Sequence, residues 1–236
     1  MLSVVIPAFN ESARIIATLD ELARYLGEQE YISEVVVVDD GSVDDTADLV
    51  SQWAADRADT RLIRIRHAGK GWAVRCGMLA ARGAYRFMCD ADLAMPVHWI
   101  GEFIERMEAG LDIVIGSREV AGARRFDEPG YRHLMGRVFN RVVRLLAVSG
   151  FQDTQCGFKC FRAAAAEELF SLQRTRGMGF DVEILFLGVK RGFSIEEMPI
   201  DWYHQAVSKV RPGVDTIDML KDTIVIRLRD VTRRYG

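Results

Sequence analysis

The chain has 236 residues, 49% of them hydrophobic, which is enough to bury the core of one large domain. Its formal net charge of −3 gives no global basic field, so we expect no nucleic-acid partner. The sequence contains no uncharged apolar run of the roughly 20 residues that a bilayer span requires, and its N-terminus lacks the basic segment of a secretory signal.

In the first half of the chain, apolar strand-like segments alternate with amphipathic helical patterns. We predict strands at residues 2–6, 34–38, 62–66 and 84–89, and helices between them that end near residues 26, 55 and 81. The segment 34–38 is almost entirely valine, which is typical of a parallel strand covered on both faces. The alternation predicts an α/β fold with a Rossmann-like, mainly parallel sheet and helices on both faces.

Polar loops follow these strands at residues 7–11, 39–42, 67–71 and 90–92. Ligands of parallel sheets bind beyond the carboxyl ends of the strands, so we expect these loops to line one crevice. The first loop lacks the Gly-x-Gly-x-x-Gly fingerprint, which argues against a nicotinamide enzyme. The loop around Gly69-Lys70-Gly71 lacks the hydroxyl residue and the spacing of a P-loop.

Asp90 and Asp92 stand two residues apart at the end of the predicted fourth strand. Residues i and i+2 of an extended segment point to the same side, so both carboxylates can turn toward one hard cation. Mg2+ or Mn2+ held by two carboxylates keeps positions for waters and substrate phosphates. Taken alone, the pair fits two solvated turn carboxylates better than a metal site.

The second half of the chain is less regular. We predict a helix at 99–107, a strand at 112–115, a turn that presents Arg118, and a mobile surface loop at 119–130. A basic amphipathic segment at 132–148 precedes a polar patch and a short strand. The remaining predictions are helices at 163–172 and 181–191, one or two strands within 194–203 broken at Pro199, and a long helix at 214–234.

Three motifs occur in the order and spacing of the family 2 inverting glycosyltransferases: residues 3–11, residues 36–42 and Asp90-Ala91-Asp92. The loops at 67–71, 90–94, 116–118 and 153–159 look most like the dolichyl-phosphate beta-glucosyltransferase branch of the polyprenyl-phosphate enzymes. The resemblance runs from residue 3 to about residue 212. It implies the GT-A fold with a C-terminal elaboration on the acceptor side.

The resemblance implies a nucleotide-sugar donor, with a UDP-sugar favoured, and it suggests roles for residues of the polar loops. Asp39 would accept from the uracil imide, and Asp92 would hold the Mg2+ or Mn2+ that bridges the diphosphate, with Asp90 facing the ribose or the metal. The other donor-side candidates are Pro7, Phe9, Glu11, Asp40, Lys70, Lys209 and Arg211, with His204 as a third metal ligand. The alternatives are a helix cap for Asp39 and Asp40, solvated charges for Lys70 and Arg118, and a structural role for His204.

Two acceptor chemistries stay open. A polyprenyl phosphate is already anionic and needs no general base, only cations that position it, and the candidates are Arg118, Arg132, Arg137, Lys159 and Arg211. A sugar hydroxyl needs a carboxylate base, for which Asp153 is the candidate, although Asp153 can also merely fix its loop. Asp92, Asp153 and Arg118 are therefore the expected catalytic residues.

These features predict a metal-dependent inverting glycosyltransferase that moves glucose from UDP-glucose to a polyprenyl phosphate. The alternatives are a GDP-mannose donor, a soluble hydroxyl acceptor, or a nucleotide-sugar-binding protein without catalysis. We expect one domain, 1–236, made of a nucleotide-sugar-binding half (1–118), an acceptor-side half (119–213) and a C-terminal amphipathic helix (214–236).

The location and the partners of the protein are predicted from weaker signals. Cysteines without a paired Cys-x-x-Cys ladder indicate reduced thiols and a cytoplasmic protein. The basic segment 132–148 or the arginine-rich terminus can contact a membrane at the cytoplasmic face, the alternative being a helix packed on the core with a solvated basic face. A homodimer is a further expectation.

Overall fold

The structure is a computed structural model that describes residues 1–204 and 214–235, without the side chains of Tyr131, Arg132, Leu134, Val214 and Asp215. Its strands are β1 (Leu2–Ala8), β2 (Ser33–Asp39), β3 (Thr60–Arg64), β4 (Tyr85–Met88), β5 (Ile113–Ser117), β6 (Arg124–Phe126), β7 (Lys159–Arg162), β8 (Ile195–Pro199) and β9 (Asp201–Tyr203). Its helices are α1 (Ile15–Gly27), α2 (Thr46–Ala54), α3 (Lys70–Ala80), α4 (Trp99–Glu108), α5 (Gly130–Leu146), α6 (Ala163–Leu172), α7 (Phe180–Arg191) and α8 (Val214–Val231).

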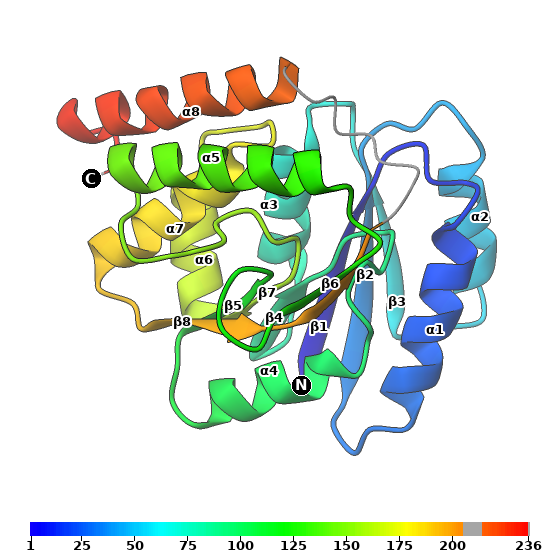
Figure 1. Ribbon diagram of the computed structural model, residues 1–236. Coiled ribbons are helices and arrows are strands. Elements are labelled where there is room, and N and C mark those ends of the chain that lie inside the picture. The colour runs from blue at the N-terminus through cyan, green and yellow to red at the C-terminus, as the bar shows by residue number, and fades with distance from the viewer. Residues whose placement is uncertain (205–213, 236) are drawn as a thin grey trace.

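A seven-stranded sheet in the order β3-β2-β1-β4-β7-β5-β8 forms the centre of the described part of the chain (Figure 1). β7 runs antiparallel to its neighbours β4 and β5, whereas the other adjacent pairs of this sheet are parallel. The predicted mainly parallel sheet is confirmed. Because β7 comes from the second half of the chain and lies between two strands of the first half, both halves share one sheet.

Apolar side chains cover both faces of the sheet, as the valine-rich segment predicts. In β2, Val36 and Val38 join one apolar cluster, with side chains of α3, α5, α6, α7 and α8. Val35 and Val37 join the other cluster, with side chains of α1, α2 and α4. The alternation follows from the two-residue repeat of a strand, which sends successive side chains to opposite faces.

β1 continues through Pro7 to Ala8, so the predicted end of this strand at residue 6, before the proline, was wrong. The carbonyl of Val5 accepts a hydrogen bond from the N–H of Cys89, just past the end of β4. Pro7, two residues further on, faces the same side of β1, where β4 has already ended. A strand tolerates proline where no partner needs its missing N–H.

The segment 119–130, predicted as an irregular loop, contains β6, which pairs in parallel with β9. Arg124 forms an ion pair with Asp201 at 2.5 Å, and the ring of Phe126 stacks on that of Tyr203 with centroids 4.5 Å apart. These partners lie more than 70 residues away along the chain, so no local pattern indicates the strand. The predicted break at Pro199 is confirmed, because β8 ends there and β9 follows.

Two expectations from composition can be compared with the structure. No helix within residues 1–204 and 214–235 has both the length and the apolarity to cross a bilayer. The four cysteines are free, and burial raises the pKa of each thiol.

Candidate active site at the carboxyl edge of the sheet

Hydrogen bonds of short side chains join the loop after β1 to the loop after β2. Asn10, which follows β1 and has a positive φ of 53°, donates its backbone N–H to Ser42 Oγ at 2.8 Å. Its side-chain oxygen accepts from the N–H of Val43 at 2.9 Å. Asp39, at the end of β2, is buried and accepts the N–H of Ser42 at 3.3 and 3.4 Å. Asp39 therefore lies beside the loop after β1, as predicted.

The loop after β3 is held by the carboxylate of Asp40. Asp40 Oδ1 accepts the N–H of Ala68 at 2.8 Å, Oδ2 accepts that of Gly69 at 2.9 Å, and the His67 ring nitrogen Nδ1 lies 2.9 Å from Oδ2. The ring of His67 also stacks on the ring of Phe9, with the two ring centroids 4.3 Å apart. Asp40 is only 2% exposed, so it supports this loop rather than facing a ligand.

Gly69 allows this loop to pack against the segment before α7. Its φ is +103°, and a Cβ at this position would lie 2.7 Å from the carbonyl oxygen of Arg176. The same carbonyl accepts the N–H of Trp72 at 3.1 Å, in the first turn of α3. The close approach fixes the start of α3 and, with it, the position of Lys70.

Lys70 joins the third loop to the acidic pair. Its Nζ lies 2.6 Å from Asp90 Oδ1. Burial works to lower the pKa of Lys70, but the charges of Asp90 and Asp181 outweigh it and raise that pKa above its ordinary value. A Cβ at Gly157 would lie 1.9 Å from Asp90 Oδ2, so only glycine lets the backbone before β7 come this close to the carboxylate. The four predicted loops therefore meet, and a fifth, 153–158, joins them.

Asp90 and Asp92 have the chemistry of a small divalent cation site. Burial and the neighbouring charge of Asp90 raise the pKa of Asp92, because both destabilise its ionised form. A bound cation would stabilise that ionised form. Mg2+ and Mn2+ commonly take only one or two carboxylates and complete their shell with phosphates and water, so the two residues fit such an ion. Across residues 1–204 and 214–235, no group of three or more possible metal ligands occurs. Within this part of the chain His204 does not complete a three-ligand group with the acidic pair, although the N–H of the neighbouring Tyr203 donates to the carbonyl of Ala94 at 2.8 Å.

Arg118 and Asp153 form a bidentate ion pair at the end of β5. Asp153 is fully buried; its Oδ2 accepts Arg118 Nε at 2.6 Å and the Arg118 backbone N–H at 3.0 Å, and its Oδ1 accepts Arg118 Nη2 at 2.9 Å. Oδ1 also accepts the N–H of Gln155 at 3.2 Å. The structure brings together two of the predicted catalytic residues and engages both oxygens of the carboxylate.

The electrostatics of this pair make Asp153 a weak base. Burial works to raise the pKa of Asp153, but the charge and hydrogen bonds of Arg118, together with the charge of Lys159, outweigh it and hold that pKa well below its usual range. A general base works best with a pKa near the operating pH. Arg118, in contrast, has five N–H donors and gives only two of its side-chain donors to Asp153, so the guanidinium keeps donors for an anion.

Lys159 lies in the interior and not at the surface of the site. It is 1% exposed, and its Nζ donates to Asp181 Oδ1 and to the carbonyl of Cys156, both at 2.5 Å. Burial raises the pKa of Asp181, against the lowering effect of Lys159 and Lys70. In this arrangement Lys159 contacts no space that an acceptor phosphate could enter, so its role is to hold the loop 153–158.

The remaining predicted residues fall into three groups. Pro7 lies in β1 and Glu11 in the loop after it; the N–H of Glu11 donates to Thr46 Oγ1 at 2.7 Å. Arg137 is exposed on α5. The side chain of Arg132 and the residues Lys209 and Arg211 lie outside the described part of the chain.

Three supporting residues were not predicted. Glu197 of β8 accepts the N–H groups of Gln152 and Asp153 at 2.7 and 2.8 Å. Asn140 of α5 donates to the carbonyl of Gln152 at 2.9 Å. The guanidinium of Arg118 also lies 5.4 Å from the centre of the Trp202 ring. No local motif surrounds these residues, and each acts on a segment distant in sequence.

The family model for glycosyl transferase family 2 matches residues 3–170 of this chain. A dolichyl-phosphate beta-glucosyltransferase of Dictyostelium discoideum is 35% identical over 246 residues, which cover 97% of this chain and 74% of the relative. The Saccharomyces cerevisiae protein of the same name is 35% identical, covering 96% and 74%, and the Homo sapiens one is 33% identical, covering 98% and 76%.

Solved structures with a similar fold include glucosyl-3-phosphoglycerate synthase of Mycobacterium tuberculosis in complex with Mn2+, UDP-glucose and phosphoglyceric acid. It matches with a TM-score of 0.70 at 19% identity and covers 96% of this chain and 79% of that one. The same enzyme bound to phosphoglyceric acid alone matches with a TM-score of 0.71 at 20% identity, with the same coverage. At this identity the likeness concerns the fold.

Proposed function

The chain belongs to glycosyltransferase family 2, and we propose that it transfers glucose from UDP-glucose to the phosphate of a dolichol-type polyprenyl lipid, with inversion at the anomeric carbon. Its fold is the GT-A fold, with the predicted mainly parallel sheet. Relatives named for this reaction align with nearly the whole chain, which supports the proposal.

The state of Asp153 is the observation that favours a phosphate acceptor. A hydroxyl acceptor has to lose a proton in the transition state, and the carboxylate that could take it is buried, bidentate with Arg118 and of low pKa. A phosphate monoester brings an anionic oxygen and needs no base. In this proposal Arg118 binds the acceptor phosphate with its remaining N–H donors, and Asp153 is a positioning residue that orients the guanidinium.

On the donor side, we assign the nucleoside to the first three loops. The buried carboxylate of Asp39 would accept from the uracil imide, and the stacked rings of Phe9 and His67 would wall the base. Lys70, which Gly69 positions, contacts Asp90 in this structure. When the donor binds, Lys70 would leave Asp90 and donate to the diphosphate. Glu11 and Pro7 complete the predicted nucleoside side.

The acceptor oxygen attacks the anomeric carbon as the bond from that carbon to the diphosphate oxygen breaks, so the configuration inverts. Asp90 and Asp92 would hold Mg2+ or Mn2+, and the ion would supply positive charge next to the leaving diphosphate. The missing side chain of Gly157 leaves the space that the Asp90 carboxylate occupies for this task. Arg118 and the acidic pair thus serve opposite sides of the reacting sugar.

We propose the same division of the chain as the sequence predicts, within one domain. Residues 1–118 provide the donor loops, residues 119–213 provide Asp153 and the elements around it, and residues 214–236 contain the C-terminal helix. The position of β7 between β4 and β5 supports a single folding unit, because neither part forms the sheet alone.

The test is a matrix of donors and acceptors with the purified chain. Nucleoside diphosphate release and lipid product are measured with UDP-glucose or GDP-mannose, a short-chain prenyl phosphate or a free sugar, and Mn2+, Mg2+ or EDTA. We expect the fastest transfer from UDP-glucose to the prenyl phosphate with a divalent cation present. Asp92→Asn should abolish it, and the exposed Asp56→Asn, as a matched control, should not.

Other outcomes would redirect or end the proposal. Faster transfer to free sugars than to the prenyl phosphate would contradict the phosphate acceptor. A preference for GDP-mannose would replace the donor, and full activity in EDTA or in Asp92→Asn would contradict the metal role. Binding of UDP-glucose without turnover for any acceptor would favour a binding protein without catalysis.

A further inference from the structure

The C-terminal helix α8 turns its main apolar stripe toward solvent. Ile217, Ile224, Leu228 and Val231 follow a helical repeat on one face and are 55, 52, 58 and 78% exposed. The face that packs on the protein carries Met219, Thr223 and Ile226 instead. Exposing four large aliphatic side chains on one face to water is unfavourable, so this face indicates a binding surface.

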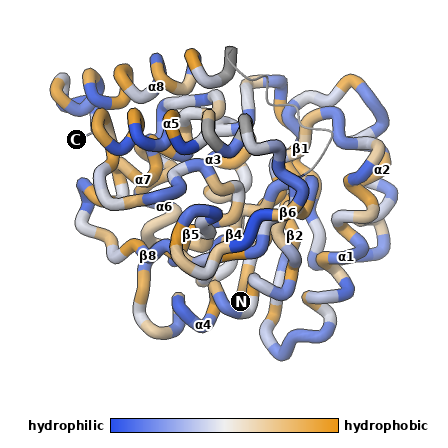
Figure 2. The backbone as a smooth tube through the Cα atoms, in the orientation of Figure 1, coloured by the Kyte–Doolittle hydropathy of each residue, from blue (hydrophilic) through white to orange (hydrophobic). Residues whose placement is uncertain are grey.

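Helix α5 lies beside α8 (Figure 1). It packs on the core through Phe139 and Val143, while Val138 and Leu145 are 58 and 81% exposed on the opposite face. Figure 2 shows orange apolar segments alternating with blue polar ones along both helices. Both helices lie on the side of the molecule where the parallel strands end, which is the side of the candidate active site (Figure 1).

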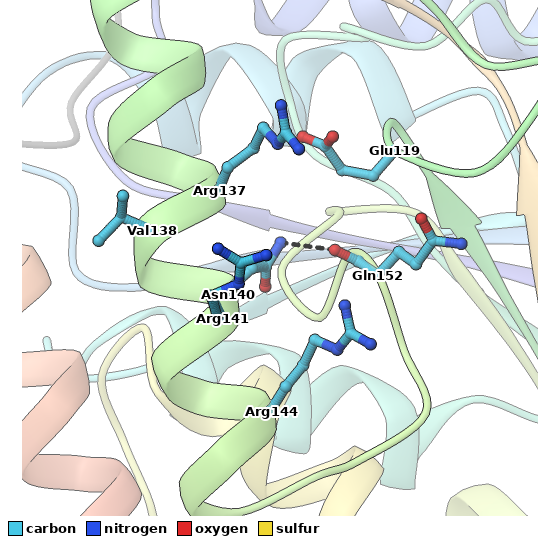
Figure 3. A pocket seen from close by; sticks show the side chains of 7 residues that line it. All are labelled: Glu119, Arg137, Val138, Asn140, Arg141, Arg144 and Gln152. Atoms are coloured by element: carbon cyan, nitrogen blue, oxygen red, sulfur yellow. Dashed lines mark hydrogen bonds between the residues drawn. The ribbon is translucent and has the colours of Figure 1, made fainter.

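Arginines border the apolar face of α5. The helix contains arginines at 132, 137, 141 and 144 and no acidic residue, although the chain as a whole has a net charge of −3. Arg137, Arg141 and Arg144 line a pocket of about 330 Å3, and the other lining residues are Glu119, Val138, Asn140 and Gln152. Figure 3 shows Arg137 and Arg144 extending from α5 toward this pocket, with the carboxylate of Glu119 facing Arg137. Among the described residues, these three arginines have no ion pair.

A second pocket, of about 230 Å3, is lined both by residues of the site and by residues of the two helices. Arg118 and Gln155 belong to the site, Met135, Phe139 and Met219 provide apolar lining from α5 and α8, and Glu119 and Glu128 also line the pocket. An acceptor whose phosphate contacts Arg118 would find apolar side chains from α5 and α8 next to it. The apolar surface is thus continuous with the place that the proposed function gives to a lipid phosphate.

We propose that the outward faces of α5 and α8 dock the protein on a bilayer that contains anionic lipid. Ile217, Ile224, Leu228, Val138 and Leu145 enter the boundary between headgroups and acyl chains, and the arginines of α5 bind the lipid phosphates. Apolar residues on one face with arginines beside them are the signature of helices that lie in a membrane interface. The inference rests on the proposed function, since it explains how the chain reaches an acceptor held in a membrane.

Vesicle sedimentation tests this surface. The full chain is mixed with vesicles of phosphatidylcholine alone or with phosphatidylglycerol, and the bound fraction is measured. The wild type should bind the anionic vesicles more tightly. Each arginine near such a surface strengthens binding by about fivefold, so Arg141→Gln with Arg144→Gln should weaken it about 25-fold. Leu145→Ser with Leu228→Ser should weaken it about tenfold or more, since each leucine loses the burial of its side chain.

Matched controls lie away from this surface. Ile32→Ser replaces an apolar side chain of similar exposure, 74%, next to the start of β2, and Arg24→Gln removes an exposed charge on α1. Both should bind vesicles like the wild type. All variants should transfer glucose to a water-soluble short-chain prenyl phosphate at rates within about twofold, and their thermal midpoints report whether they fold.

The outcomes separate this inference from the proposed function. A wild type that stays in solution with anionic vesicles, or surface variants that sediment like the wild type, would overturn the docking surface even if transfer to the soluble acceptor is normal. The surface variants can lose vesicle binding while the wild type transfers glucose to no acceptor. That result would support the docking surface and refute the proposed glucosyltransferase function. A dimer that Leu145→Ser with Leu228→Ser splits into monomers would assign the surface to self-association and overturn the proposal.

Discussion

Asp153→Asn distinguishes a base from a positioning residue in the acceptor site. The substitution keeps the shape of the side chain and removes its charge. In the wild type, Asp153 accepts two side-chain bonds from Arg118, at 2.6 and 2.9 Å, and the backbone N–H groups of Arg118 and Gln155. Asparagine has one acceptor oxygen, and its amide N–H2 would face the N–H donors of the guanidinium.

The cost of the substitution follows from the burial of the pair. Breaking a buried ion pair on one side costs about 3–5 kcal/mol. The side chain of Arg118 is 21% exposed, so water compensates part of the loss and we take the lower end, about 3 kcal/mol. For a chain of this size each kcal/mol shifts the thermal midpoint by about 2–4 °C, so Asp153→Asn should melt about 6–12 °C lower.

The effect should also depend on pH. The pKa of Asp153 is lower in the folded protein than in the unfolded chain, so the ionised carboxylate stabilises the fold fully above the unfolded value of about 4. This stabilisation is lost as the pH falls below that value toward the folded pKa. The difference in free energy of unfolding between wild type and variant should therefore be constant near neutrality and shrink below about pH 4.

Urea unfolding across pH and the pH dependence of transfer rates provide the measurement. A positioning residue predicts that Asp153→Asn lowers the rate at every pH from about 6 to 9 without moving an inflection. The exposed control Asp56→Asn should stay within about 0.5 kcal/mol of the wild type. If Asp153→Asn has wild-type stability and removes an inflection near neutral pH, the carboxylate is a titrating base and the reasoning about Arg118 is wrong.

Two further predictions concern the donor side. Gly157→Ala would place a Cβ 1.9 Å from Asp90 Oδ2, so the carboxylate must move, and the rate of transfer in initial-rate assays should fall about 100-fold. The control Gly27→Ala, with open space around the new Cβ, should keep the wild-type rate. An active Gly157→Ala would show that the position of Asp90 is not critical. Asp40→Asn leaves one acceptor for the two N–H groups of the loop after β3 and should cost about 1–3 kcal/mol in urea unfolding and raise the KM for the donor. Unchanged stability and KM would mean that Asp40 does not hold this loop.

Most of the fold could be predicted because its signals are local. The repeat of apolar residues separates strands from helices, and helix α6 occupies the predicted range 163–172. The meeting of the polar loops followed from the rule that parallel strands end at one edge, and Lys70 with Asp90 bears it out. The pairing of β6 with β9 could not be predicted, because its contacts join segments far apart in the chain.

The charged residues show most clearly what could not be predicted from the sequence. Lys159 and Arg118 are both cations in motif-like loops, yet Lys159 is buried against Asp181 whereas Arg118 keeps donors toward the site. Sequence patterns do not state which carboxylate meets which cation. That choice depends on the course of the chain between β5 and β7, which brings Asp153 beside residue 118.

The sequence by itself determined the α/β fold, the edge of the sheet where the site forms and the acidic pair at the end of β4, because backbone geometry dictates the repeats of strands and helices. The tertiary structure decided what the charged and apolar side chains do. It committed Asp153 to Arg118 and turned the stripe of Ile224 and Leu228 outward, since the amphipathic repeat of a helix is the same whichever face the core selects. Partners of a side chain are settled only when distant segments pack together.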